Sequence, residues 1–213
     1  PFRYFACDHL EESLFPLETW GRSAVVGVTR ALRAEPNIIR VFSGADDNQL
    51  TFTPNIQASV MLNRGEWVEF EASQSFRVVG TKSLQVVQFL VGQNYGGQDS
   101  DLEGVGDPSM SLVPPEDQFR REYTFLAPNT YSEHWANIIA RQGQSVTLNG
   151  TEVQGFIPIE GTSWRVAQVQ INAGIQTANS DQPFGVWVYG FGAYTSYMYP
   201  AGLDLRVIND LMY

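Results

Sequence analysis

Short runs of β-branched and aromatic residues, divided by clusters of Gly, Pro, Asn and Asp, occupy most of this chain. Runs of this kind are typical of β-strands joined by turns. They predict strands at about 23–29, 38–43, 49–53, 57–62, 66–71, 76–80, 84–91, 122–126, 135–140, 145–148, 164–171, 184–191 and 194–199. Only His9 to Phe15 and Pro115 to Arg121 have a helical pattern, and both segments are short. We therefore expect an all-β fold, an antiparallel β-sandwich-like domain with long loops and at most two short helices.

Two segments are predicted to be hairpins. In SVTLNGTEV, Asn149-Gly150 supplies the left-handed backbone that a tight turn requires. In SGADDNQLTF, the polar run Asp46-Asp47-Asn48 can close a slightly longer turn.

The chain has 213 residues, enough for one sizeable β domain or two small ones. No period of about 20 to 50 residues repeats, which disfavours a propeller or a solenoid. We expect one β-rich domain over residues 1–213, with a division into two smaller sandwiches near residues 92–120 as the alternative. Residues 92–108 form the one long interior segment without a predicted strand, and loops of this length are usually functional or mobile.

The same loop carries the clearest candidate for metal binding. Asp99, Asp101, Glu103 and Asp107 alternate with other residues on a Gly-rich backbone, and oxygen ligands of this kind bind calcium. The order DSDLEGVGDP is not that of an EF-hand loop, so a solvated acidic loop is the competing interpretation. No other cofactor is expected.

Tyrosines gather near the C-terminus, in PFGVWVYGFGAYTSYMYPAGLDL. A tyrosine offers a large contact area at a small entropic cost, which suits a partner-binding surface. We expect that surface to combine the 92–108 loop with this Tyr-rich end, and we name Tyr95, Tyr194 and Tyr197 as its candidate residues. A packed terminal hairpin is the alternative explanation of the same pattern.

The charge of the chain narrows the choice of partner. Its formal net charge is -10 and its pI is near 4.6. Binding to nucleic acid needs clustered Lys and Arg, so nucleic acid and anionic membranes are disfavoured. No apolar run approaches the roughly 20 residues that a membrane-spanning helix needs, so we expect no insertion into a membrane.

Catalytic patterns are scarce. The two histidines, His9 and His134, each stand beside a carboxylate, but adjacent residues of a strand point to opposite faces. Neither a G-x-S-x-G elbow, nor an H-E-x-x-H pair, nor a phosphate-binding Gly-rich loop is present. We therefore expect no enzyme. A carbohydrate-active enzyme with two paired carboxylates stays an alternative, because the chain has 23 acidic residues.

Four blocks in one order carry a family resemblance: CDHLEESLFPLETWG, VVQFLVGQNYGG, GDPSMSLVPPEDQFRREYTFLAP and PFGVWVYGFGAYTSYMYPAGLDL. Together they resemble the amino-terminal domain of IgGFc-binding proteins, including bacterial secreted and surface relatives. The resemblance covers nearly all of the chain from Cys7 to Leu205.

The resemblance implies an extracellular or cell-surface location and a role in binding or adhesion. It also implies that the family domain extends upstream of Pro1, so that Cys7 pairs with a cysteine of that segment. The expected partners are a protein or glycan ligand, other domains of the same protein and further copies of the chain. A structural subunit of an extracellular assembly is the alternative to a binding module.

Overall fold

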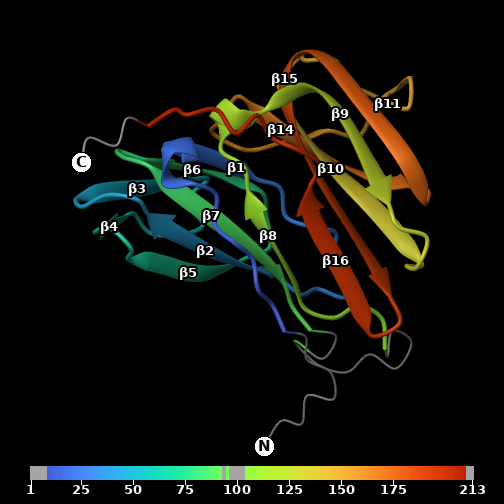
Figure 1. The fold of residues 1–213 in the computed structure, drawn as a ribbon, viewed down its shortest axis with the longest axis horizontal. Coiled ribbons are helices and arrows are strands. Elements are labelled where there is room, and N and C mark those ends of the chain that lie inside the picture. Colours follow the sequence, from blue (N-terminus) through green and yellow to red (C-terminus); the bar gives the residue numbers. More distant parts are fainter. Residues whose placement is uncertain (1–8, 93–94, 96–103, 210–213) are drawn as a thin grey trace, which may run out of the picture.

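The computed structural model describes residues 9–92, 95 and 104–209. Within these ranges the strands form three sheets, and every pairing of strands is antiparallel (Figure 1). The first sheet has the order β1 (Ser23–Val26), β6 (Phe76–Gly80), β3 (Asn48–Thr53) and β4 (Val60–Leu62). The second has the order β5 (Trp67–Ala72), β2 (Asn37–Ser43), β7 (Leu84–Leu90) and β8 (Ser109–Val113). The predicted all-β antiparallel fold is confirmed.

The third sheet is organised around the long strand β15 (Gly174–Gly192). The first part of β15 pairs with β9 (Arg120–Ala127) and β11 (Thr147–Leu148), and β11 pairs with β12 (Thr151–Glu152). The second part pairs with β10 (Glu133–Arg141) and β16 (Thr195–Pro200). Beyond β10 lie β14 (Trp164–Ile171) and β13 (Ile157–Pro158).

Three apolar cores hold the sheets together. The strands β1 to β8 of the first two sheets form the first half of the chain, and β9 to β16 of the third sheet form the second half. The largest core lies between the first two sheets and also includes Trp164, Trp187 and Phe119, which come from or directly precede the second half. The second lies between the two parts of the third sheet and includes Phe184. The third contains Trp135, Tyr189 and Met198. Because the largest core draws on both halves of the chain, the contact between the halves is itself apolar. The predictions of one domain, or of two units dividing near 92–120, stay predictions.

The expected helices are mostly wrong. His9 to Phe15 is not helical, and helical conformation in the described residues is limited to two 3-10 turns, η1 (Leu17–Thr19) and η3 (Glu116–Gln118). Pro115 and Phe119, on either side of η3, are both extended. The spacing of polar and apolar residues in HLEESLF is compatible with a helix. A helix of this length is not stable, however, unless one of its faces packs against the rest of the protein.

One of the two expected hairpins is confirmed and the other is wrong. β11 and β12 pair across Asn149 and Gly150, with φ of 52° and 78°. Asp47 also has a left-handed φ of 52°, but β2 and β3 on either side of it belong to different sheets. The segment SGADDNQLTF therefore carries the chain from one sheet to the other.

A network of buried side-chain amides joins the two halves through residues 27–30. Asn137 on β10 donates to the carbonyls of Gly27 and Val28, both at 2.9 Å. Gln88 on β7 donates to the Gly27 carbonyl at 3.1 Å and to Asn37 Oδ1 at 2.8 Å. The hydroxyl of Tyr189 on β15 donates to Asn137 Oδ1 at 3.2 Å. Buried amides with full sets of partners fix one relative placement of the strands that carry them.

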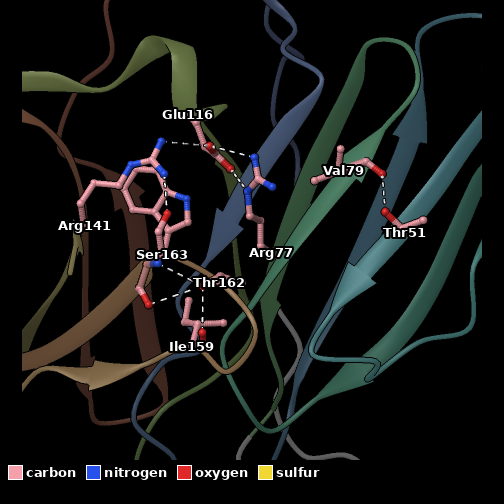
Figure 2. A network of polar contacts seen from close by, with 9 residues as sticks. Thr51, Arg77, Val79, Glu116, Arg141, Ile159, Thr162 and Ser163 are labelled. Carbon is pink, nitrogen blue, oxygen red and sulfur yellow. Dashed lines mark hydrogen bonds and ion pairs between the residues drawn. The ribbon is translucent and has the colours of Figure 1, made fainter.

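A charged cluster fastens the same two halves at another point, which Figure 2 shows. Glu116 of η3 accepts hydrogen bonds from Arg77 Nε at 2.5 Å and Arg77 Nη2 at 3.2 Å. Arg141 Nη2 lies 3.8 Å from Glu116 Oε2, the oxygen that also accepts from Arg77 Nη2. The Arg141 guanidinium also stacks 3.8 Å above the ring of Trp164 and donates to Ser163 Oγ at 2.6 Å. Since the Glu116 side chain is only 9% exposed, the cluster is a structural ion pair.

Candidate functional site

The turn between β15 and β16 presents an exposed aromatic side chain. Gly192 pairs with Thr195, so the turn consists of Ala193 and Tyr194. Tyr194 has a φ of 52° and is 55% exposed. A bulky residue in the left-handed region is strained by about 1 kcal/mol, and such strain gathers at functional positions.

The segment 104–107 fixes this turn. The Tyr194 N–H donates to the Gly104 carbonyl at 2.5 Å, and Val105 forms an antiparallel bridge with Ala193. The Gly106 N–H donates to the Gly192 carbonyl at 2.9 Å. A Cβ atom at Gly104 would stand 2.8 Å from the Tyr194 ring, so only glycine lets the ring lie against this backbone. The ring is therefore exposed to solvent and yet held in place.

Tyr95 lies beside the same segment. Its hydroxyl bonds to the Glu71 carboxylate on β5. Together with Val105, Gly106 and Ser196 it lines a small cavity of about 10 Å³. That volume holds about one water molecule, so the cavity is too small for a substrate. We call Tyr95, residues 104–107 and residues 192–196 the tyrosine end.

Tyr197, the third tyrosine named from the sequence, is packed away from the tyrosine end. It faces the second core, opposite to its neighbours Ser196 and Met198, because side chains alternate along a strand. Its ring lies on Gly190, where a Cβ atom would come within 2.4 Å of it, and lies 4.7 Å from the ring of Tyr131. Its hydroxyl and His134 Nδ1 are 2.9 Å apart. These contacts give Tyr197 a packing role.

The contacts of His134 are those of a structural residue. Burial lowers its pKa below the usual 6.5, and a hydrogen bond that the ring donates to the backbone of Tyr131 opposes that shift. The ring is then neutral at pH 7, with Tyr197 as its side-chain partner. Ser132 donates through its backbone N–H to Phe191 and takes no part in the His134 contact. No nucleophile and base pair of the kind that acyl transfer needs is formed here.

The candidate calcium ligands Asp99, Asp101 and Glu103 lie outside the described residues, as does Cys7. Asp107 is described and is 3% exposed, and its backbone N–H donates to Ser196 Oγ at 2.9 Å. Among the described residues, no group of three His, Cys, Asp or Glu side chains is placed to hold a metal ion. The calcium site and the Cys7 disulfide stay predictions.

The residues that shape the tyrosine end were not predicted from the sequence. Gly104, Gly106 and Ser196 hold the turn through backbone and hydroxyl bonds. The repeated glycines in EGVGD were the available signal, since glycine marks a close backbone approach. The dipeptide Ala193-Tyr194 carries no turn signal, so the expected strands at 184–191 and 194–199 place the turn at 192–193 instead of at Ala193 and Tyr194.

Among the described residues, the tyrosine end has an exposed turn and a cavity of about 10 Å³. An all-β module of paired sheets with such an end belongs to the class of scaffolds that present loops. The chain belongs to the IgGFc binding protein family, whose sequence pattern it matches over residues 1–190. No curated protein matches the chain. In the part of the chain that the structure describes, no helix is long and apolar enough to cross a membrane.

Two solved structures show a faint likeness. One is described as "Pleurotus Ostreatus Lectin (POL), apo form", with 8% identity, a TM-score of 0.25 and coverage of 84% of this chain and 72% of that chain. The other is an anti-sigma factor domain-containing protein, with 8% identity, a TM-score of 0.24 and coverage of 88% and 84%. Values this low bear neither on the fold nor on the ligand of this chain.

Proposed function

We propose that the chain is an extracellular, non-catalytic binding and adhesion module that holds a protein partner at the tyrosine end. The observation that supports this most is Tyr194, a large exposed ring kept in a strained backbone conformation by bonds to Gly104. A preorganised tyrosine loses little entropy on binding and is a frequent energetic centre of interfaces. The family's name supports a protein ligand, and the same membership supports an extracellular location.

The test is to measure binding and stability in the same variants. The first probe is the Fc fragment of IgG, followed by partners captured on the chain from its native surroundings. In Tyr194→Asn the backbone strain is relieved, because Asn tolerates a positive φ. We expect the free energy of unfolding to change by less than about 1 kcal/mol, while affinity for the partner falls about tenfold or more.

Two further variants sharpen the test. Gly104→Ala keeps the tyrosine but displaces its ring, so it should also weaken binding. Asp47→Gly is the matched control, since Asp47 has the same φ of 52° at a turn in the other half of the chain. Unchanged affinity in Tyr194→Asn, or an equal loss in Asp47→Gly, would contradict the proposal.

The alternatives have less support. A glycosidase keeps one carboxylic acid in an apolar setting as its general acid. Of the described carboxylates with little exposure, Glu116 is committed to Arg77 and Arg141. Asp107, which is 3% exposed, lies in the segment that bonds to the β15–β16 turn, beside a cavity too small for a sugar. A structural subunit would pair through sheet edges, but the edge strand β5 exposes Glu69 and Glu71, and charges on an edge discourage pairing. Light scattering after size exclusion measures the oligomeric state: fixed polymers without ligand would favour the structural subunit.

A further inference from the structure

Strand β15 separates from β9 near its middle and leaves a hollow. Asn179 pairs with Glu122, but the next pair is Phe184 with Arg120, so residues 180–183 bulge out of the ladder. Gln144 fixes the bulge by donating to Ser180 Oγ and to the Gln182 carbonyl, both at 2.9 Å. Bulges of this kind often redirect side chains beside functional sites.

The C-terminal segment closes another side of this hollow. Gln118, which is fully buried, accepts a hydrogen bond from the Arg206 N–H and donates to the Arg206 carbonyl, both at 2.8 Å. The Asp204 N–H donates to the Gln118 carbonyl at 3.1 Å. On the opposite side, the Tyr123 hydroxyl donates to the Phe184 carbonyl at 2.5 Å and accepts from the Arg120 N–H at 2.9 Å. The walls are therefore held by buried hydrogen bonds and form a built site.

The hollow has the size of a ligand site. It consists of two adjoining cavities of about 230 and 400 Å³ that share Arg120 and Glu122. Sites for small ligands usually measure about 300 to 1,000 Å³. The polar side chains of the lining are Arg120, Arg121, Glu122, Thr124, Asp204 and Arg206.

The charge of the lining is positive by one, in a chain of net charge -10, because three arginines and two carboxylates line the hollow. Asp204 lies between two of them, 3.7 Å from Arg120 Nε and 3.5 Å from Arg206 Nε. In the part of the chain that is described, the Arg121 side chain makes no hydrogen bond or ion pair. The Arg121 guanidinium therefore remains available for a planar anion.

The mixture of charges indicates the chemical class of the ligand. A guanidinium fork matches a carboxylate or a sulfate, and the oxygens of Glu122, Asp204 and Thr124 can accept bonds from hydroxyl groups. A peptide with several acidic residues would meet repulsion from the two carboxylates. We propose that this hollow binds a saccharide unit that carries one acidic group, either a carboxylate or a sulfate.

Phe184, where pairing with β9 resumes beside the hollow, and Gly192, where the turn to β16 begins, are at opposite ends of the second part of β15. The eight residues from Phe184 to Phe191 span roughly 25 Å along a strand. The saccharide site does not depend on the function proposed for the tyrosine end.

The test is isothermal titration of the whole chain with methyl β-glucuronide, N-acetylneuraminic acid and galactose 6-sulfate, with methyl β-glucoside as the neutral probe. We expect at least one acidic sugar to bind saturably and the neutral sugar not to bind. Arg121→Gln should lower the affinity about tenfold without a change in the thermal midpoint, because a charge-assisted bond is lost and no internal contact is broken. Arg64→Gln, an exposed arginine of the first half, is the matched control.

Three results would overturn the proposal. The first is the failure of every acidic sugar to bind at millimolar concentration. The second is equal binding of the neutral sugar, or an equal loss in Arg64→Gln. The third is tighter binding of a hexapeptide of glutamates, which would assign the site to acidic peptides. Loss of the acidic sugar in Arg121→Gln together with unchanged partner binding separates this site from the tyrosine end.

Discussion

Polar and aromatic side chains are placed differently at the tyrosine end and at the seam, which is the buried network of Asn137, Gln88, Tyr189 and residues 27–30 between the two halves of the chain. In the seam, Asn137 and Gln88 are buried. The Asn137 amide bonds across the seam to the carbonyls of Gly27 and Val28, and the Gln88 amide bonds to Gly27 and Asn37 on its own side. At the tyrosine end, Tyr194 is exposed, strained and held by the backbone. In the seam, the polar groups form their hydrogen bonds inside the protein. At the tyrosine end, a rigid aromatic ring is exposed to solvent. The difference separates residues that hold the fold from residues that are free to meet a partner.

The largest effect is expected at the centre of the seam. Asn137→Leu removes two hydrogen bonds to the carbonyls of Gly27 and Val28 and the acceptor of the Tyr189 hydroxyl. We expect a loss of about 3 kcal/mol in the free energy of unfolding, measured with urea, because buried polar groups lose partners. Asn179→Leu, at an exposed position of β15, should change it by less than about 0.5 kcal/mol. A loss below about 1 kcal/mol in Asn137→Leu would show that the network is not structural.

A smaller effect is expected at the charged cluster of Figure 2. Glu116→Gln leaves Arg77 and Arg141 without their carboxylate. Both arginines keep some contact with water, so we expect a loss of about 2 kcal/mol. Glu69→Gln breaks the exposed pair with Arg40 and should cost less than about 1 kcal/mol. Equal losses in the two variants would contradict the structural role of Glu116.

The smallest effect concerns pH. Burial lowers the pKa of His134 in the folded chain, so the unfolded chain binds this proton first as the pH falls through about 6.5. Stability should therefore decline below pH 6.5, with a contribution to the slope of at most about 1.4 kcal/mol per pH unit. His134→Gln should remove that contribution, while His9→Gln, at an exposed position, serves as the control. A slope that is the same in His134→Gln as in the parent chain would refute the assignment.

Strands in which apolar and polar residues alternate were predicted from the sequence, and strands without this alternation were missed. Residues 76–80 and 164–171 were predicted with the bounds that the structure has. The first part of β15 was missed because its inward side chains are Gln176 and Ala178, which give no apolar signal. β8 was missed because Ser109 and Ser111 are buried in it. A strand that buries small or polar residues cannot be found from hydrophobic period alone.

The candidate site was predictable only in part. The association of the 92–108 region with the Tyr-rich end is seen in the bonds between residues 104–107 and the β15–β16 turn. The sequence did not predict which tyrosine is exposed. The exposure depends on the position of the two-residue turn, and Ala193-Tyr194 is not one of the dipeptides that mark such turns. The arginine-lined hollow needed the structure as well, since Arg121 and Arg206 are far apart in sequence and meet only through the C-terminal segment.

Hydrogen exchange on the chain with and without its captured partner tests most directly whether the tyrosine end is the binding surface. The account predicts that the partner slows exchange in residues 104–107 and 192–196 and leaves residues 27–30 of the seam unchanged. Slowed exchange confined to the outer face of β5 and β2, or to the arginine-lined hollow, with none at residues 104–107 and 192–196, would contradict it.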